Sequence, residues 1–153
     1  METIILLAGI TLFVFATYSD VKSFRISNFL VAAVALLGIT RLIGIGDPSA
    51  ALYTVSASLA ILAVGFVLFW QGFCGGGDAK LVAAAALLVG YHDLISFLLL
   101  MSISGVLVSL TVIVTHWSSK RKATLAVPYG VAIATAGGVT LFFQFPFLSS
   151  LMS

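Results

Sequence analysis

The chain has 153 residues, of which 61% are hydrophobic and 8% are charged, and its mean hydropathy is +1.24. Soluble domains carry roughly 25% charged residues, so this composition predicts an all-α integral membrane protein with one domain over residues 1–153. The net charge of +2 comes from scattered residues, which argues against nucleic acid as a partner. A single cysteine, Cys74, excludes an internal disulfide and a multi-cysteine metal cluster, so we expect no metal or cofactor.

The first apolar segment, residues 3–19, is just long enough to cross a bilayer as a helix. Its only preceding charge is Glu2 and it has no small-x-small cleavage site, so we interpret it as a permanent helix and not a removable signal peptide. A polar interruption, residues 20–28, separates it from a second apolar segment, residues 29–45. Ser27 or Asn28 at the end of that interruption can cap the second helix.

Arg41 lies near the far end of the second segment, from which its long side chain is expected to reach the membrane interface. Asp47 as N-cap and Pro48 at the first helical position predict the start of a third helix, and that segment, residues 50–70, ends on Trp70. The fourth segment, residues 81–90, has only ten clearly apolar residues, a rise of about 15 Å against a hydrocarbon core of roughly 30 Å.

Two further apolar segments, residues 94–115 and 125–145, complete a prediction of six transmembrane helices. If all six cross, one side of the membrane carries six basic residues and the other keeps only Arg41; the six are Lys22, Arg25, Lys80, Lys120, Arg121 and Lys122. The positive-inside rule makes the first side cytoplasmic and places both termini on the non-cytoplasmic side. Without the fourth crossing this segregation of charge is lost, so the charge pattern supports the short segment as a span.

A glycine run, Gly75, Gly76 and Gly77, precedes Asp78 between two strongly apolar segments. Without Cβ atoms, these glycines can adopt backbone angles closed to other residues and let a second backbone lie close beside them. Placing a carboxylate at the start of an apolar helix costs free energy if it enters hydrocarbon, so its presence indicates a functional role. The alternative is a flexible turn in which Asp78 merely caps the next helix.

In this topology Asp20 and Asp78 are the two acids on the cytoplasmic side, because Glu2, Asp47 and Asp93 fall on the other. Two carboxylates brought together at a partly dry interface cannot both ionise easily, so one keeps its proton. The charged member can then take a proton from an attacking water while the protonated member donates to the tetrahedral oxygen and the leaving amine. We therefore hypothesise that Asp20 and Asp78 form the catalytic dyad of an aspartic endopeptidase.

Three segments carry a resemblance to a known family. Residues 75–81, GGGDAKL, match the GxGD-x-K-[LM] motif of type IV prepilin peptidases. Residues 20–28 resemble their first-aspartate motif, in which the acid is followed by Arg-Ile-Pro-Asn, although Ser27 replaces the proline. Residues 128–133, PYGVAI, resemble their Pro-[FY]-Gly-Pro-x-Ile segment, although Val131 replaces the second proline.

The resemblance implies a six-helix membrane aspartyl endopeptidase whose catalytic residues are Asp20 and Asp78. It implies cleavage of the basic leader from prepilin-like precursors, at the cytoplasmic face of a prokaryotic inner membrane, after a glycine that precedes the precursor's hydrophobic helix. The expected partners are that precursor and membrane lipids. The short chain, without a cysteine-containing domain near its start, resembles the form found in tight-adherence (Flp) pilus systems, and we expect no methyltransferase activity.

Each of several further residues could either support the site or simply contact the membrane surface. Lys80 could favour the ionised form of a nearby carboxylate or contact lipid headgroups. The same two alternatives apply to Arg25 and Asn28. Tyr129 could line the substrate groove or serve as an interfacial aromatic. The full set of expected supporting residues is Gly75, Gly76, Gly77, Lys80, Arg25, Asn28, Pro128, Tyr129 and Gly130.

Other functions fit part of the sequence. The same architecture serves preflagellin-type peptidases, which leaves the substrate open between the two groups. Paired acids can also relay protons in a small ion or proton transporter, although we find neither an inverted repeat nor acids near the membrane midplane. A non-catalytic assembly subunit of a pilus or secretion machine is the third alternative.

Overall fold

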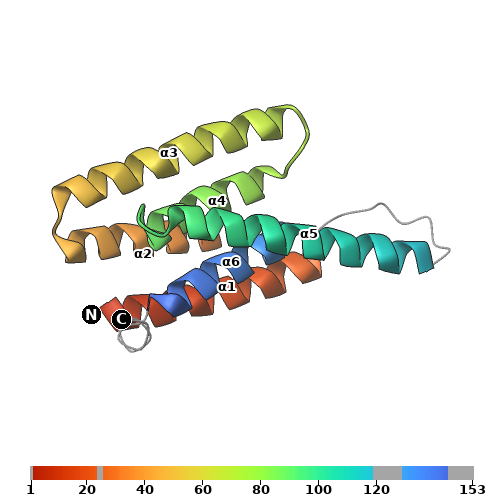
Figure 1. Cartoon of the computed structure of the whole chain (residues 1–153), viewed down its shortest axis with the longest axis horizontal. Coiled ribbons are helices and arrows are strands. Elements are labelled where there is room, and N and C mark those ends of the chain that lie inside the picture. The colour runs from red at the N-terminus through yellow and green to blue at the C-terminus, as the bar shows by residue number, and fades with distance from the viewer. Residues whose placement is uncertain (1, 24–25, 119–128, 145–153) are drawn as a thin grey trace.

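The structure, a computed structural model, describes residues 2–23, 26–118 and 129–144. These residues form helices that alternate in direction (Figure 1). The helices are α1 (Glu2–Ser23), α2 (Asn28–Ile45), α3 (Pro48–Trp70), α4 (Gly76–Val89), α5 (Leu94–Ser118) and α6 (Tyr129–Phe143). The expected all-α fold class is confirmed.

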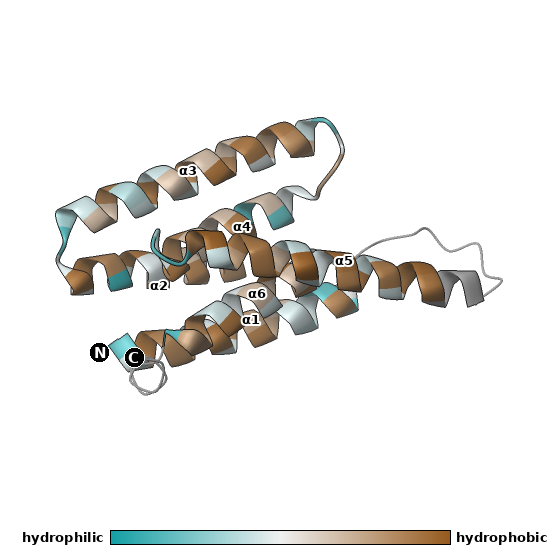
Figure 2. Cartoon of the chain, in the orientation of Figure 1, coloured by the Kyte–Doolittle hydropathy of each residue, from teal (hydrophilic) through white to brown (hydrophobic). Residues whose placement is uncertain are grey.

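Four helices, α1, α2, α3 and α5, are long and apolar enough to cross a membrane. Apolar residues dominate α5 and the later turns of α3 (Figure 2), and many of their side chains are exposed at the surface of the bundle. This pattern is typical of helices that face lipid. Helix α6 is apolar but has 15 residues and α4 has 14, so the crossing of the membrane by these two helices stays a prediction.

Two helix starts follow the local signals in the sequence. Ser27 is the N-cap of α2, where its hydroxyl accepts a hydrogen bond from the N–H of Phe29 at 3.3 Å. Asp47 is the N-cap of α3, where its carboxylate accepts from the N–H of Ser49 at 2.9 Å, and Pro48 follows at the first helical position. The hydroxyl of Ser49 and these backbone donors hold the pKa of Asp47 below its usual value. Both predicted caps are confirmed.

The end of α1 differs from the prediction. Residues 20–28 were expected to interrupt the helix, but α1 continues to Ser23 and carries Asp20 in its last turns. The physical reason is that hydropathy reports where the chain leaves an apolar environment, whereas backbone hydrogen bonding can continue a helix into polar surroundings. Asp20 is therefore fixed by a helix and does not belong to a loop.

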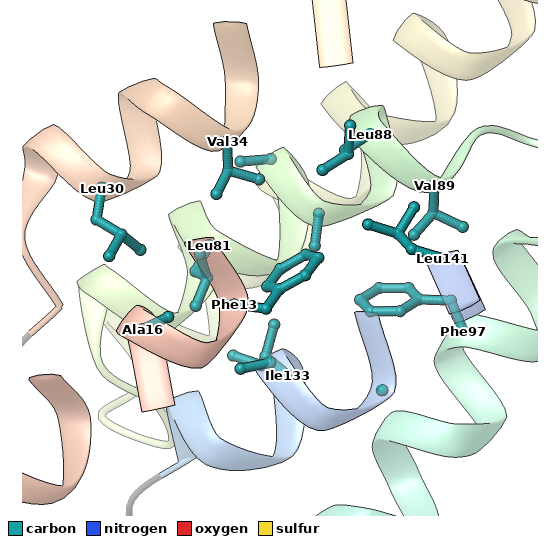
Figure 3. Close-up of a cluster of buried hydrophobic side chains, with 14 of the residues drawn as sticks. Phe13, Ala16, Leu30, Val34, Leu81, Leu88, Val89, Phe97, Ile133 and Leu141 are labelled. Carbon is teal, nitrogen blue, oxygen red and sulfur yellow. The ribbon is translucent and has the colours of Figure 1, made fainter. Parts of the chain in front are cut away.

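Helix α4 lies at the centre of the bundle, in contact with α2, α3 and α6, and α1 packs along α6. Eight of the 14 residues of α4 are buried, which explains why so short a helix holds its place. Figure 3 shows the core around it, where Leu81 and Leu88 of α4 meet Phe13 of α1 and Ile133 of α6. Phe97 and Leu141 close the same cluster.

Small residues let α4 approach its neighbours closely. A Cβ atom added to Gly65 of α3 would lie 2.9 Å from the Cβ of Ala79, and one added to Gly38 of α2 would lie 3.0 Å from the backbone of Leu87. The buried hydroxyl of Ser58 also donates to the carbonyl of Ala83 at 2.8 Å. Contacts of this kind are typical of helix packing in membranes. They fix the helix that carries Asp78.

Two polar side chains donate hydrogen bonds to the C-terminal end of α4, one from the last turns of α2 and one from the residue that follows α6. Arg41 donates to the carbonyls of Leu88 at 2.7 Å and Val89 at 3.1 Å, and Gln144 donates to Val89 at 2.9 Å. Arg41 also forms an ion pair with Glu2 at 3.3 Å. The side chain of Arg41 is 11% exposed and satisfies carbonyls that the end of a helix leaves without partners, while its position relative to the membrane interface stays a prediction.

Candidate active site

Asp20 lies in α1 with its carboxyl group against the start of α6. Its side chain is buried, with 4% of the residue exposed. The backbone N–H groups of Gly130 and Val131, in the first turn of α6, donate hydrogen bonds to it. A Cβ atom at residue 130 would lie 2.7 Å from Oδ2 of Asp20, so this close approach requires glycine. The start of α6 therefore forms a cradle for the first acid.

The two oxygens of Asp20 differ in their surroundings. Oδ2 is buried and has no hydrogen-bond partner within residues 2–23, 26–118 and 129–144. A buried carboxylate oxygen without a partner is costly in a folded protein and calls for an explanation. An atom in this state can accept a hydrogen bond from a water molecule or from a second carboxyl group.

Asp78 lies in the first turn of α4, three residues before the apolar segment 81–90 and outside the four candidate spans. Its carboxylate turns back to accept a hydrogen bond from the N–H of Gly75, the N-cap of the helix. A Cβ atom on Gly75 would lie 2.8 Å from Oδ2 of Asp78, which explains glycine at this position. Burial, followed by the negative charge of Asp20, raises the pKa of Asp78 to about 6.

Ile26 lies close to the glycine beside each acid, Gly77 next to Asp78 and Gly130 against Asp20. A Cβ atom on Gly77, next to Asp78, would lie 3.3 Å from the Cβ of Ile26, and one on Gly130, against Asp20, would lie 3.0 Å from its Cδ1. The end of α1 and the starts of α4 and α6 lie at the same end of the bundle (Figure 1). The electrostatic effect of Asp20 on Asp78 agrees with this placement. The structure thus brings the two predicted acids to one site.

The glycine run does not adopt the unusual backbone angles that the sequence suggested. Among the described residues, the glycines with positive φ are Gly46, Gly72 and Gly90, whereas Gly76 and Gly77 are already helical. The reason for glycine at these positions is contact, since a Cβ on Gly76 would lie 3.3 Å from the ring of Phe69. The left-handed backbone angle in the turn between α3 and α4 belongs to Gly72, with φ 79°, which precedes the glycine run. This part of the prediction is wrong.

The other expected residues are placed as follows. Lys80 donates to the side-chain oxygen of Asn28 at 3.4 Å, a surface contact that joins the starts of α4 and α2. Tyr129, at the start of α6, is 43% exposed and borders a groove beside Asp78. Arg25 and Pro128 lie outside the described residues, as does the basic run at 120–122.

The groove is a feature that the sequence analysis missed. It has a volume of about 790 Å³ and runs between α3 and α5, over a floor of α4 and α6, with Asp78 and Cys74 in its lining. Burial and the charge of Asp78 raise the pKa of the Cys74 thiol, which fits an inert apolar lining residue and not a nucleophile. The signal that could have found the groove is the small-xxx-small spacing of Gly105 and Ser109 in α5.

Comparison with known proteins assigns the chain to a family. The sequence profile of the Type IV leader peptidase family matches residues 7–110. Two curated relatives, the prepilin leader peptidase/N-methyltransferases of Burkholderia pseudomallei strains 1026b and K96243, are each 34% identical over 73 residues, which is 48% of this chain and 23% of each relative. No solved structure gives a significant match. Since the family profile covers well over half of the sequence, the chain belongs to the type IV leader peptidase family.

Proposed function

We propose that this protein is an aspartic endopeptidase that removes the basic leader of prepilin-like precursors. The observation that carries the proposal is the pair of acids at one end of the bundle, Asp20 of α1 against the start of α6 and Asp78 in the first turn of α4. Membership of a leader peptidase family supports the class of reaction. Methyl transfer, which the names of the two relatives include, is not part of the proposal.

In the proposed mechanism the two acids have different roles. Burial of Asp20 disfavours its charged form, but two backbone N–H groups donate to its carboxylate and stabilise that form, so we assign Asp20 as the base. The raised pKa of Asp78 makes it the acid that holds the shared proton. Asp20 takes a proton from water as the water oxygen attacks the carbonyl carbon, and Asp78 gives its proton to the carbonyl oxygen. The C–N bond then breaks as Asp20 gives its proton to the leaving amine and Asp78 takes a proton back from a hydroxyl group of the intermediate, which leaves a carboxylic acid and restores both side chains.

The proposed orientation places this site at the cytoplasmic face of a prokaryotic inner membrane. The basic residues Lys22 and Lys80 lie at the same end of the bundle as the two acids, in agreement with the positive-inside rule. A precursor with a basic leader presents the peptide bond to be cut on that side, just before its hydrophobic helix enters the bilayer. Pilin-like precursors are our first choice of substrate, and preflagellin-like precursors are the alternative.

The test is cleavage of a purified precursor with a basic leader and a hydrophobic helix. Wild-type protein should shorten it, and Asp20→Asn and Asp78→Asn should each lower the rate at least about 100-fold, because one loses the base and the other the proton donor. The rate should fall as pH rises above about 6, where Asp78 loses its proton. Asp47→Asn is the matched control, since asparagine also caps a helix and the residue is distant from the site.

Substantial cleavage by either site variant would overturn the proposal. If the wild-type protein in vesicles carries protons or ions and leaves the precursor intact, the transporter alternative gains support. The measurement therefore separates the two function classes with one set of variants.

A further inference from the structure

The groove between α3 and α5 has the shape of a docking site for a helix. On α5 its lining residues recur every three or four positions from Leu98 to Ile113, and on α3 they do so from Ala60 to Leu68. The residues from Leu98 to Ile113 span about 22 Å, and those from Ala60 to Leu68 span about 12 Å, so the groove is about four helical turns long on α5 and about two on α3. A single apolar helix of similar length fits along it.

The groove opens sideways, toward the surroundings of the bundle. Helices α3 and α5 diverge at the end that carries the two acids (Figure 1), and neither packs extensively against the other. Val64 on one wall and Val106 on the other are 61% and 59% exposed. An occupant must therefore be apolar and can enter from within the bilayer, without passing through water.

Small side chains make the groove suitable for the backbone of another helix. Ser102, Gly105 and Ser109 lie on the α5 wall. A Cβ atom on Gly105 would have one neighbour within 4 Å, the Cβ of Ala132 at 3.9 Å, so space remains above this residue. Small residues of this kind allow close approach and van der Waals packing between helices in lipid.

One end of the groove reaches the acid site. Asp78 and Tyr129 belong to its lining, beside Ala79 and Ile133 on the floor. A carboxylate at the end of the groove gives no favourable contact to an apolar lipid chain. A precursor that is cut next to its hydrophobic helix, in contrast, requires an apolar groove that ends at the reacting groups. The groove supplies the apolar track, and Asp78 in its lining supplies one of the two acids.

We propose that the hydrophobic helix of the precursor docks lengthwise between α3 and α5, with its cytoplasmic end at Asp78 and Tyr129. The docked helix positions the peptide bond that precedes it over the acid pair. This inference rests on the proposed function, because the occupant is the substrate of that reaction. It assigns substrate selection to the walls of the groove, at residues away from the two acids.

The first test fills the groove. Gly105→Trp should lower kcat/KM for the full precursor at least tenfold, mainly through a higher KM, because the indole occupies the path of the substrate helix. Leu107→Trp is the matched control: Leu107 lies on the same helix, is 60% exposed and lies outside the groove lining. It should leave kcat/KM within about twofold of wild type. Equal kcat/KM for the two variants would overturn the proposal.

The second test detects docking without catalysis, and so remains informative if the tryptophan variant fails to fold or the proposed function fails. In a Cys74→Ser, Asp20→Asn background, Val106→Cys should form a disulfide with a cysteine placed in the precursor's hydrophobic helix, and Leu107→Cys should not. Crosslinking at Val106→Cys with no cleavage by the wild type would refute the peptidase and keep the docking site. Cleavage with equal or absent crosslinking at the two positions would leave the peptidase intact and assign the groove to lipid.

Discussion

Gly75 and Gly130 each stand where any side chain would collide with an acid. The Cβ of a residue at 75 would lie 2.8 Å from Oδ2 of Asp78, and one at 130 would lie 2.7 Å from Oδ2 of Asp20. Real Cβ atoms do not approach other heavy atoms so closely, so each carboxyl group would have to move. The two glycines thus share one function, which is to leave room for a carboxylate beside the first turn of a helix.

Gly130→Ala should displace Asp20 and lower the rate of precursor cleavage at least tenfold, with a loss of about 1–3 kcal/mol in stability from overpacking. Gly138→Ala is the matched control in the same helix, because a Cβ there would meet no atom within 4 Å. That variant should keep its activity and gain up to about 1 kcal/mol from helix propensity. Cleavage rates and thermal unfolding of the purified variants measure both effects. Equal behaviour of the two variants would contradict the proposed crowding at Asp20.

At the scale of the element, α4 is short, and eight of its 14 residues are buried. Its 14 residues rise about 21 Å, less than the thickness of a bilayer core. Its last carbonyls therefore end inside the bundle, where water is scarce and each needs a donor. Arg41 and Gln144 provide those donors, so they anchor one end of the helix that presents Asp78 at the other.

Arg41→Met should lower the stability of the protein by about 1–3 kcal/mol for each buried carbonyl left without a partner. Glu2→Gln removes the same ion pair but leaves Arg41 on the carbonyls, and Glu2 is 55% exposed, so it should change stability by less than about 1 kcal/mol. Unfolding in a denaturing detergent compares the two. If both variants lose the same stability, the ion pair and not the capping of α4 is the important interaction.

For the whole molecule, the alternating helices place the end of α1, the α3–α4 connection and the start of α6 at one end, and the α2–α3 and α4–α5 connections at the other (Figure 1). If these helices cross a membrane, the two acids, Lys22 and Lys80 lie on one side of it, and Arg41 lies toward the other. His92, between α4 and α5, is exposed at the opposite end. The proposed orientation can therefore be tested with one residue from each end.

In a Cys74→Ser background, His92→Cys should react with a membrane-impermeant thiol reagent added to intact cells. Lys22→Cys should react only after the cells are opened, because the positive-inside rule assigns its end to the cytoplasm. Labelling of Lys22→Cys from outside would reverse the orientation, and labelling of both from outside would contradict the crossing of α4.

The sequence predicted those features that depend on neighbouring residues or on the balance of charge. Caps at Ser27 and Asp47 follow from short-range hydrogen bonding, and the placement of Asp20 and Asp78 at one end followed from the distribution of lysine and arginine. The role of the glycine run was beyond such reasoning, because Gly77 packs against Ile26, a residue from a different helix connection. The groove was missed for the same reason, since its walls are formed by helices that are not adjacent in the chain.

The dependence of Asp20 on the first turn of α6 has a consequence for biosynthesis. The two N–H donors and the glycine that accommodate this acid belong to the sixth helix, far downstream of the first. A nascent chain that has inserted only its earlier helices lacks that support, even though both acids are already present. If the two acids act as proposed, the protein is expected to stay inactive on the ribosome and to gain peptidase activity once its sixth helix has been inserted.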